Sequence, residues 1–384
     1  MIKTRDQALI SYYYGKAIAT YRAGISIIKQ RIKNPQWNIL GAYHCLNVGD
    51  MSLGKAIELL LAKEGLFSAH LISLPHYKRY VPAKFTILGG GAIMQPNNLY
   101  KLWELSRGNQ CKTAIVGVDI GNISDEYRSF IRELNCVSCR GYHLNNEQRE
   151  SLQKRIGRKV IFHPDLAFSL YSNHSNLSDD CEQKKIGINL LPWHFRLKKS
   201  KWIPEDCSRN YFGRFSKQEG NINLGKNYIQ LIKEVISYYK SMGYVVYHFP
   251  FAIEDDLFAR TVLSQMDVIF LKYSSDPEIV LDRMNKLSLF IATRLHAHIF
   301  ALIKQVPLLS IAYGTKCESL FRYIQKQSSD QITQNDFLRL ENNLEDQMAL
   351  LLSKTPVVLS KKQLEFLSSE VSLAVAQCIH SMLD

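Results

Sequence analysis

Short apolar runs alternate with amphipathic segments through most of this chain of 384 residues. In the first half, apolar runs predict strands, and segments with helical spacing predict the helices between most of them. The strands are expected at 37–43, 69–74, 85–88, 113–118, 136–140 and 159–162, and the helices at 50–65, 99–105, 125–134 and 145–156. Short, nearly continuous apolar strands of this kind are typical of a doubly wound parallel α/β sheet.

The second half repeats the pattern after a polar stretch, 172–184. This stretch shows neither the period of a helix nor that of a strand, so it predicts a linker. Strands are expected at 186–191, 244–249, 268–271, 289–292 and 308–313, helices at 225–241, 255–265, 276–287 and 296–305, and final helical stretches at 336–353 and 361–382. We therefore expect an N-terminal domain over residues 1–175, a C-terminal domain over 176–355, and a helical segment over 356–384 that packs back on the first domain. Two such domains facing one another would form a central cleft.

The N-terminal segment 5–33 predicts a long basic helix. Its apolar positions are Leu9, Ile10, Tyr13, Ile18, Tyr21, Ile25 and Ile28, set against Lys16, Arg22, Lys29, Arg31 and Lys33. The pattern favours a helix packed on its own domain, and it leaves open a helix that lies on anionic lipid. No apolar run of about 18 residues is found near the N-terminus, so we expect no membrane-spanning helix there. The expected location is the cytoplasm, with contact at the inner face of the membrane left open.

Composition narrows the class of partner. Hydrophobic residues make up 46% and charged residues 22% of the chain, as in a folded globular protein, and the formal net charge is +13. Such a charge suits a polyanion, an anionic membrane surface or a phosphorylated substrate. The basic residues are spread along the chain without a zinc-finger or RNA-binding signature, so we expect no nucleic acid partner.

The eight cysteines are scattered, which predicts reduced thiols and no disulfide. Cys136 and Cys139 have CxxC spacing inside an apolar strand, and we interpret them as core residues. Since there is no second CxxC pair and no spaced His or Asp set, no metal site is expected.

Three charged or titratable side chains follow apolar strands where helices are expected to begin. Arg294 and His296 come directly after the strand at 289–292, and Lys316 follows the strand at 308–313. In a parallel α/β sheet this is the edge where anions bind. The arginine and lysine could hold an anion, and the imidazole could move a proton. The alternatives are that His296 is an ordinary surface or core histidine and that Lys316 is a solvent-exposed lysine at a helix N-terminus. His298 is expected to be structural.

Other candidates occupy the same kind of position. They are Asn47, Gly49 and Asp50 after the first strand, Gly89, Gly90 and Gly91 after the third, Arg140 at the end of the fifth, Asp165 after the sixth, and His194 in the second domain. The first group could cap a helix as well as contact a ligand, and Asp165 could be a capping residue. The three glycines indicate that backbone comes close to another group, for which a bound ligand is the favoured explanation over a plain turn.

At these residues the chain resembles the polysaccharide pyruvyl transferase family over about 38–325. The resemblance is carried by Asn47-x-Gly49-Asp50, Gly89-Gly-Gly91, Ser138-x-Arg140, Pro164-Asp165, Arg294-x-His296 and Pro307 to Lys316. It implies a pair of Rossmann-like domains in a GT-B-like arrangement. It also implies transfer of a pyruvyl group from phosphoenolpyruvate to two hydroxyls of a sugar, in a surface glycan such as a capsule or exopolysaccharide, or in its lipid-linked precursor.

The resemblance further implies that Arg140, Arg294, Leu295, His296 and Lys316 bind the donor, and that Arg294, His296 and Lys316 serve catalysis. Phosphoenolpyruvate is then a co-substrate, and no resident cofactor is expected. Asn47 to Asp50, the three glycines, Asp165 and His194 remain candidates for the cleft or the acceptor side. Two other classes stay open at this point: a GT-B glycosyltransferase that uses a nucleotide sugar, and a non-catalytic scaffold of a glycan pathway. The sequence does not specify the oligomeric state.

Overall fold

The computed structural model describes residues 2–44, 46–107, 112–120, 125–141, 144–171, 184–192, 195–198, 201–204, 222–312, 315–327, 337–339 and 345–384. The chain divides into two compact units. The N-terminal unit comprises Lys16–Asn173, Ser275–Pro277 and Ser360–Asp384, and the C-terminal unit comprises Met1–Gly15, His174–Ser274 and Glu278–Leu359. The predicted linker at 172–184 lies outside the described residues except for residue 184.

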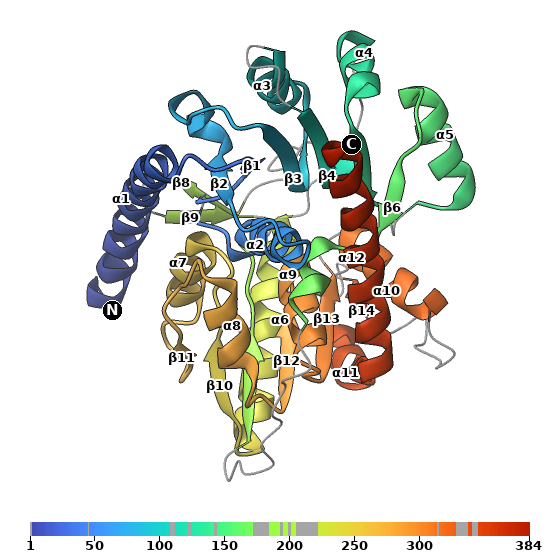
Figure 1. Ribbon diagram of the computed structural model, residues 1–384. Coiled ribbons are helices and arrows are strands. Elements are labelled where there is room, and N and C mark those ends of the chain that lie inside the picture. The colour runs from blue at the N-terminus through green and yellow to red at the C-terminus, as the bar shows by residue number, and fades with distance from the viewer. Residues whose placement is uncertain are drawn as a thin grey trace. The chain divides into compact units, whose positions relative to one another are not determined.

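The N-terminal unit is built on a six-stranded parallel sheet in the order β2-β1-β3-β4-β5-β6 (Figure 1). The strands are β1 (Trp37–Gly41), β2 (Ala69–Ser73), β3 (Phe85–Met94), β4 (Lys112–Ile120), β5 (Cys136–Arg140) and β6 (Ile161–His163). The helices are α2 (Val48–Lys63), α3 (Pro96–Arg107), α4 (Asp125–Glu133) and α5 (Asn146–Ile156), with 3-10 turns η1 (Leu74–Arg79) and η2 (Leu166–Leu170). The predicted doubly wound parallel sheet is confirmed here.

Strand β3 is longer than predicted. It was expected to end at Leu88, but it pairs with β4 as far as Met94 and includes all three glycines. Gly90 and Gly91 have φ of 75° and 81°, and the pairing with β4 is irregular between Gly91 and Met94. A strand can continue through such positions because glycine tolerates positive φ.

Helix α12 (Lys361–Leu383) belongs to the N-terminal unit and contacts α2, η2, β4, β5 and β6. Its length and composition would allow it to cross a membrane. However, it buries a stripe at helical spacing, formed by Leu364, Leu367, Val371, Ala374, Val375, Cys378, Ile379 and Met382. This stripe makes α12 a core helix of the unit.

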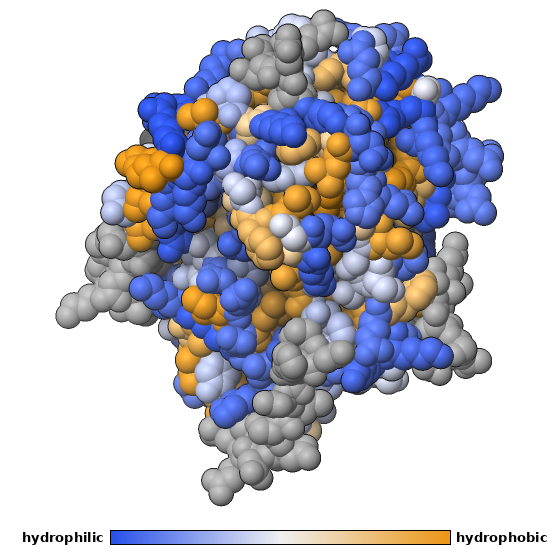
Figure 2. Space-filling model, viewed as in Figure 1, coloured by the Kyte–Doolittle hydropathy of each residue, from blue (hydrophilic) through white to orange (hydrophobic). Residues whose placement is uncertain are grey.

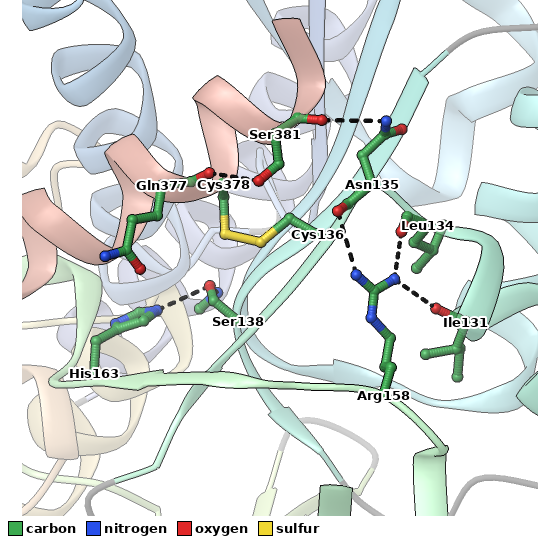
Figure 3. The surroundings of a disulfide bond; sticks show 11 residues. Ile131, Leu134, Asn135, Cys136, Ser138, Arg158, His163, Gln377, Cys378 and Ser381 are labelled. Atoms are coloured by element: carbon green, nitrogen blue, oxygen red, sulfur yellow. Dashed lines mark hydrogen bonds between the residues drawn. A yellow bond between two sulfur atoms is a disulfide. The ribbon is translucent and has the colours of Figure 1, made fainter. Parts of the chain in front are cut away.

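A disulfide joins Cys378 of α12 to Cys136 of β5, with the two Cα atoms 5.2 Å apart (Figure 3). The expectation of no disulfide is therefore wrong. Cys136 and Cys139 are buried, as predicted, but the buried stripe of α12 places Cys378 directly against β5. The two cysteines are 242 residues apart in the chain, so no local spacing could have indicated the pairing.

Helix α1 (Ile2–Lys33) ends in the N-terminal unit, to which residues from Lys16 onward belong. Its inner side buries Ala23, Ser26, Ile27 and Gln30. Ser26 Oγ donates to the carbonyl of Leu71 at 3.2 Å, and Gln30 Nε2 donates to the carbonyl of Val81 at 2.7 Å. Polar anchors therefore hold this part of the helix on the sheet.

The C-terminal unit contains a second six-stranded parallel sheet, in the order β11-β10-β7-β12-β13-β14. Its strands are β7 (Lys185–Ile188), β10 (Val245–His248), β11 (Ile269–Phe270), β12 (Leu289–Ala292), β13 (Leu308–Ala312) and β14 (Phe337–Arg339). The helices are α6 (Ile222–Ser241), α7 (Ile253–Val262), α8 (Pro277–Met284), α9 (Leu295–Ile303), α10 (Thr315–Gln327) and α11 (Glu345–Leu352). A second doubly wound sheet is thus confirmed.

Two elements of this unit differ from the prediction. The stretch 336–353 was expected to be helical, but residues 337–339 form β14 beside β13, and among its described residues only Glu345–Leu352 (α11) are helical. Three residues are too few to show a period, so pairing with β13 decides their conformation. The hairpin of β8 (Phe195–Lys198) and β9 (Lys201–Pro204) was not predicted.

Candidate active site

The C-terminal sheet has its topological switch point between β7 and β12. From β7 the chain builds outward to β10 and β11 on one side, and β12, β13 and β14 lie on the other. Ligands of doubly wound sheets bind beyond the carboxyl ends of the strands at such a point. Here β7 is followed by Asn189, and β12 is followed by Thr293 and Arg294.

Arg294 is held in a fixed orientation by Asp255, from the first turn of α7. Arg294 Nε lies 2.9 and 2.7 Å from the two carboxylate oxygens, and Nη2 lies 2.6 Å from Oδ1. The Asp255 carboxylate is fully buried and also accepts from the amides of Phe251 and Ala252 at 3.1 and 3.0 Å. The Arg294 amide donates to Asn189 Oδ1 at 3.0 Å. The guanidinium is thus oriented at the switch point, with its side chain 16% exposed.

Helix α9 starts immediately after Arg294, which is its N-cap residue and provides no side-chain cap. An α-helix offers its first amides, here those of Leu295, His296 and Ala297, to groups outside the helix. With the helix dipole, these amides favour an anion. The half-buried His296 side chain therefore lies in the first turn of a helix whose N-terminus and N-cap side chain both carry positive charge.

His298 is a structural residue, as predicted. Its Nδ1 lies 2.6 Å from the Arg294 carbonyl and its Nε2 lies 2.7 Å from Ser310 Oγ. Burial lowers the pKa of His298 to about 4, so the ring is neutral near pH 7. This imidazole joins the start of α9 to β13.

Lys316 is the second residue of α10 and is half-buried. The next residue, Cys317, is buried, and its Sγ lies 3.8 Å from the carbonyl of Thr293 at the end of β12. The start of α10 is therefore packed against the segment that precedes Arg294. Lys316, Arg294 and His296 all belong to this edge of the C-terminal sheet.

Two further histidines of this unit follow or end strands. His194 lies outside the described residues. His248 ends β10 and is fully buried, and neither ring nitrogen has a hydrogen-bond partner among the described residues. Burial, and then the charge of Arg260, lower the pKa of His248 to about 3. The neutral His248 ring therefore packs beside Phe270, with the two ring centroids 6.0 Å apart.

In the N-terminal unit, Asn47 is the N-cap of α2 and its side chain accepts from the Gly49 amide at 2.9 Å. Capping is therefore one role of this motif, and Asp50 lies in the first turn of the same helix.

The glycine run of β3 is explained by packing. A Cβ on Gly89 would lie 2.3 Å from Ile57, and a Cβ on Gly90 would lie 2.4 Å from Leu53, both residues of α2. The Tyr43 hydroxyl donates to the Gly89 carbonyl at 2.7 Å. The close approach inferred from the sequence is real, but the neighbour at Gly89 and Gly90 is the protein itself.

Arg140 lies in a buried ion-pair cluster at the carboxyl edge of the N-terminal sheet. Its Nε and Nη2 donate to the two oxygens of Asp119 at 2.8 and 2.5 Å, and its Nη1 donates to Asp165 at 2.5 Å. Asp165 also caps η2 by accepting from the Ala167 amide at 3.0 Å. The structure thus joins two predicted site residues, Arg140 and Asp165, and assigns them to a different unit from Arg294, His296 and Lys316. Their contact with a ligand stays a prediction.

Beside this cluster, Ser138 Oγ lies 3.0 Å from Nε2 of His163 (Figure 3). Burial is the main cause that lowers the pKa of His163 to about 4. This histidine is therefore a neutral part of the core of the N-terminal unit.

The sequence did not indicate two of the carboxylates that hold the arginines, Asp255 beside Arg294 and Asp119 beside Arg140, whereas Asp165 was among the candidates. Asp255 stands in an acidic first turn, Glu254-Asp255-Asp256, and Asp119 ends an apolar strand. An aspartate at the end of a buried strand was the available signal for Asp119. For Asp255 no local pattern shows which of three adjacent acidic residues faces Arg294.

The two parallel sheets, with an arginine, a histidine and a lysine beyond the carboxyl ends of one of them, define an α/β protein suited to handling an anion. Residues 34–315 match the polysaccharide pyruvyl transferase family, and the chain belongs to that family. No curated protein matches the sequence.

Among solved structures, one similar to this chain is a functionally uncharacterised protein of Klebsiella pneumoniae, with 15% identity and a TM-score of 0.39 over 83% of this chain and 98% of the other. UDP-GlcNAc 2-epimerase of Methanocaldococcus jannaschii, in complex with UDP-GlcNAc and UDP, has 10% identity and a TM-score of 0.43 over 86% and 97%. MnaA of S. aureus with UDP has 9% identity and a TM-score of 0.46 over 87% and 90%.

Proposed function

We propose that the protein transfers the pyruvyl group of phosphoenolpyruvate to two hydroxyls of one sugar in a surface glycan or its lipid-linked precursor. The products are a cyclic pyruvate ketal and inorganic phosphate. Beyond family membership, the observation that carries the proposal is the planar guanidinium of Arg294, which we call the Arg294 fork, held by Asp255 beside the first turn of α9, with His296 in that turn.

Phosphoenolpyruvate presents a carboxylate and a phosphate, and this edge offers complementary groups. The Arg294 guanidinium is oriented by Asp255, and its hydrogen bonds to that carboxylate involve Nε and Nη2. The first amides of α9 and the side chain of Lys316 add hydrogen-bond donors. Because Asp255 fixes the fork in advance, little ordering of Arg294 is required when the donor binds.

The chemistry then needs one proton carrier and stabilisation of the leaving group. An oxygen of the first sugar hydroxyl bonds to C2, the methylene carbon accepts a proton, and the hydroxyl proton is released. The bond from C2 to the phosphate oxygen then breaks. The second hydroxyl oxygen closes the ketal at C2, and its proton passes to the departing phosphate, which leaves as hydrogen phosphate. We assign proton transfer to His296, since an imidazole can both accept and donate near neutral pH. Arg294 and Lys316 stabilise the negative charge of the departing phosphate.

The direct test is incubation of the full chain with phosphoenolpyruvate and a panel of nitrophenyl and lipid-linked sugars, following inorganic phosphate and the mass of the sugar. The expected result is phosphate release matched by a ketal-linked pyruvyl group on the sugar. Substitution His296→Ala should reduce turnover by about 10²-fold or more, in the range usual for general acid–base catalysis. His380→Ala is the matched control, because its side chain is exposed on α12 of the other unit.

Ligand stabilisation separates this function from transfer of a nucleotide sugar. A ligand that binds the folded chain raises its thermal midpoint. Stabilisation by phosphoenolpyruvate, lost in Arg294→Met, supports the proposal. Stabilisation by UDP or GDP with no response to phosphoenolpyruvate, or no phosphate release across the whole panel, would overturn it.

A further inference from the structure

The outer side of α1 carries large apolar side chains where a helix on a folded domain normally carries polar ones. Tyr21, Ile28 and Ile32 are 68%, 59% and 78% exposed, and Ile25 between them is half-buried. Their spacing of four, three and four residues places them in one stripe along the helix. We call these four residues the outer stripe.

Packing on the N-terminal sheet uses the opposite side of the helix, and that side is the more polar one. Between residues 17 and 33 this side buries Ala23, Ser26, Ile27 and Gln30, of which Ser26 and Gln30 are polar. Ser26 Oγ lies 2.8 Å from His70 Nε2, and Gln30 Nε2 donates to Asn38 at 3.3 Å and to the Val81 carbonyl. The helix is thus fixed to its unit by hydrogen bonds while the outer stripe stays exposed. A stripe of this kind indicates an interaction surface.

Cations flank the outer stripe. Lys29, Arg31 and Lys33 are exposed, and Arg31 Nη2 donates to the Arg79 carbonyl at 3.0 Å. From residue 7 to residue 49 the sequence contains no aspartate or glutamate. Figure 2 shows hydrophobic and hydrophilic surface side by side where the C-terminal end of α1 lies. An apolar stripe on a helix segment whose own charged side chains are all basic complements an apolar layer beneath anionic head groups.

We propose that the C-terminal half of α1 docks on the surface of an anionic lipid bilayer. The outer stripe enters the boundary between head groups and acyl chains, and Lys29, Arg31 and Lys33 remain among the anionic head groups. Tyrosine, isoleucine and lysine in these positions match the order of polarity across that boundary. Docking requires no conformational change in the N-terminal unit, because the stripe is already exposed.

The experiment is co-sedimentation of the full chain with vesicles of phosphatidylcholine, with and without phosphatidylglycerol, at low and at physiological salt. We expect binding to the anionic vesicles that weakens with salt, and little binding to phosphatidylcholine alone. The variant I28S/I32S should bind about tenfold more weakly, because two exposed aliphatic side chains no longer enter the bilayer. The variant K29Q/K33Q should also lose about tenfold and lose most of the salt dependence.

Matched controls use α12 of the same unit. Leu373→Ser removes an aliphatic side chain that is 59% exposed, and K361Q/K362Q removes two exposed lysines. Neither control should change vesicle binding, and the thermal midpoint should confirm that all variants are folded. No phosphoenolpyruvate or sugar is present, so the outcome is independent of the proposed function.

Three results would overturn the proposal. The first is no sedimentation of the wild-type chain with anionic vesicles. The second is binding that I28S/I32S leaves unchanged. The third is a dimer in solution that I28S/I32S dissociates while the wild-type chain ignores vesicles, since a second copy of the chain would then cover the outer stripe.

Discussion

The buried pair of Asp255 and Arg294 makes a prediction that tests the site directly. In Asp255→Asn the side chain keeps its volume and one oxygen, but the charge that holds the guanidinium is lost. Breaking a buried ion pair costs about 3–5 kcal/mol, and the 16% exposure of Arg294 and the retained oxygen place this case at about 2–3 kcal/mol. For a unit of this size that corresponds to a fall in thermal midpoint of about 4–12 °C.

The same substitution should weaken binding of the donor more than it slows the chemical step. The Arg294 fork is oriented only while the carboxylate accepts from Nε and Nη2. If Arg294 binds phosphoenolpyruvate, losing that orientation weakens a charge-assisted hydrogen bond, which amounts to a rise in KM of about 10- to 100-fold. Turnover at saturating donor should change less. Steady-state kinetics with varied phosphoenolpyruvate measure the two effects separately.

A double-mutant cycle gives the decisive measurement. Asp255→Asn, Arg294→Met and the double variant should show a coupling free energy of about 1.5–3 kcal/mol, because removing the second partner costs little once the first is gone. Asp256→Asn is the control. Asp256 pairs with the partly exposed Arg260, and burial raises the pKa of its carboxyl, so neutralising it should cost less. A coupling below about 0.5 kcal/mol would refute the reasoning.

Three further predictions concern stability. The pKa of His248 is lowered from 6.5 to about 3 in the folded chain, so its contribution to stability is complete above pH 6.5 and is lost as pH falls toward about 3. His248→Leu should therefore reduce the slope of unfolding free energy against pH in this range by roughly 1.4 kcal/mol per pH unit. Denaturant titrations at several pH values measure this slope, and an unchanged slope would contradict the prediction. Gly90→Ala should lower the unfolding free energy by about 3 kcal/mol, because the new Cβ would lie 2.4 Å from Leu53 of α2. Gly65→Ala is the control: its φ is similar but the space around it is open, so the loss should be about 1 kcal/mol. Equal losses of unfolding free energy in urea would argue against packing as the reason for glycine at position 90. Cys378→Ser should lower the unfolding free energy by about 2–4 kcal/mol under non-reducing conditions. Dithiothreitol should lower the unfolding midpoint of the wild-type chain to that of the variant, and no effect of dithiothreitol would show that Cys136 and Cys378 are not joined.

The strands were predictable because burial on both faces requires continuous apolar runs, and such runs are visible without any neighbour. The segment Leu289–Ala292 illustrates this, since all four residues are apolar and buried. Phe337–Arg339 could not be predicted, because a three-residue strand exists only through its pairing with β13. The Cys136–Cys378 bond has the same origin, as it depends on how α12 packs on β5.

The candidate site shows the same difference between features with a local sequence signal and features that depend on tertiary contacts. Arg294, His296 and Lys316 could be proposed as site residues because strand ends and helix starts can be located in the sequence, and the parallel sheet brings the strand ends to one edge; their contact with a ligand stays a prediction. Asp255 and Asn189 were missed, because their role is defined by which side chain faces Arg294 across three elements. The glycine run shows the intermediate case. Close approach could be predicted from three consecutive glycines, but the approaching group could not.

Electrostatic balance distinguishes the two arginines that the sequence analysis treated alike. Among the described residues, the carboxylate that Arg294 faces is that of Asp255; the Arg294 side chain is 16% exposed, and it stands at the positive N-terminus of α9. Arg140 faces two carboxylates among the described residues and is 3% exposed. An anion gains less from a guanidinium whose charge two buried carboxylates already compensate. Within each unit taken by itself, the affinity for an anionic donor is therefore expected at the carboxyl edge of the C-terminal sheet, and the Arg140 cluster is expected to act first on the stability of the N-terminal unit.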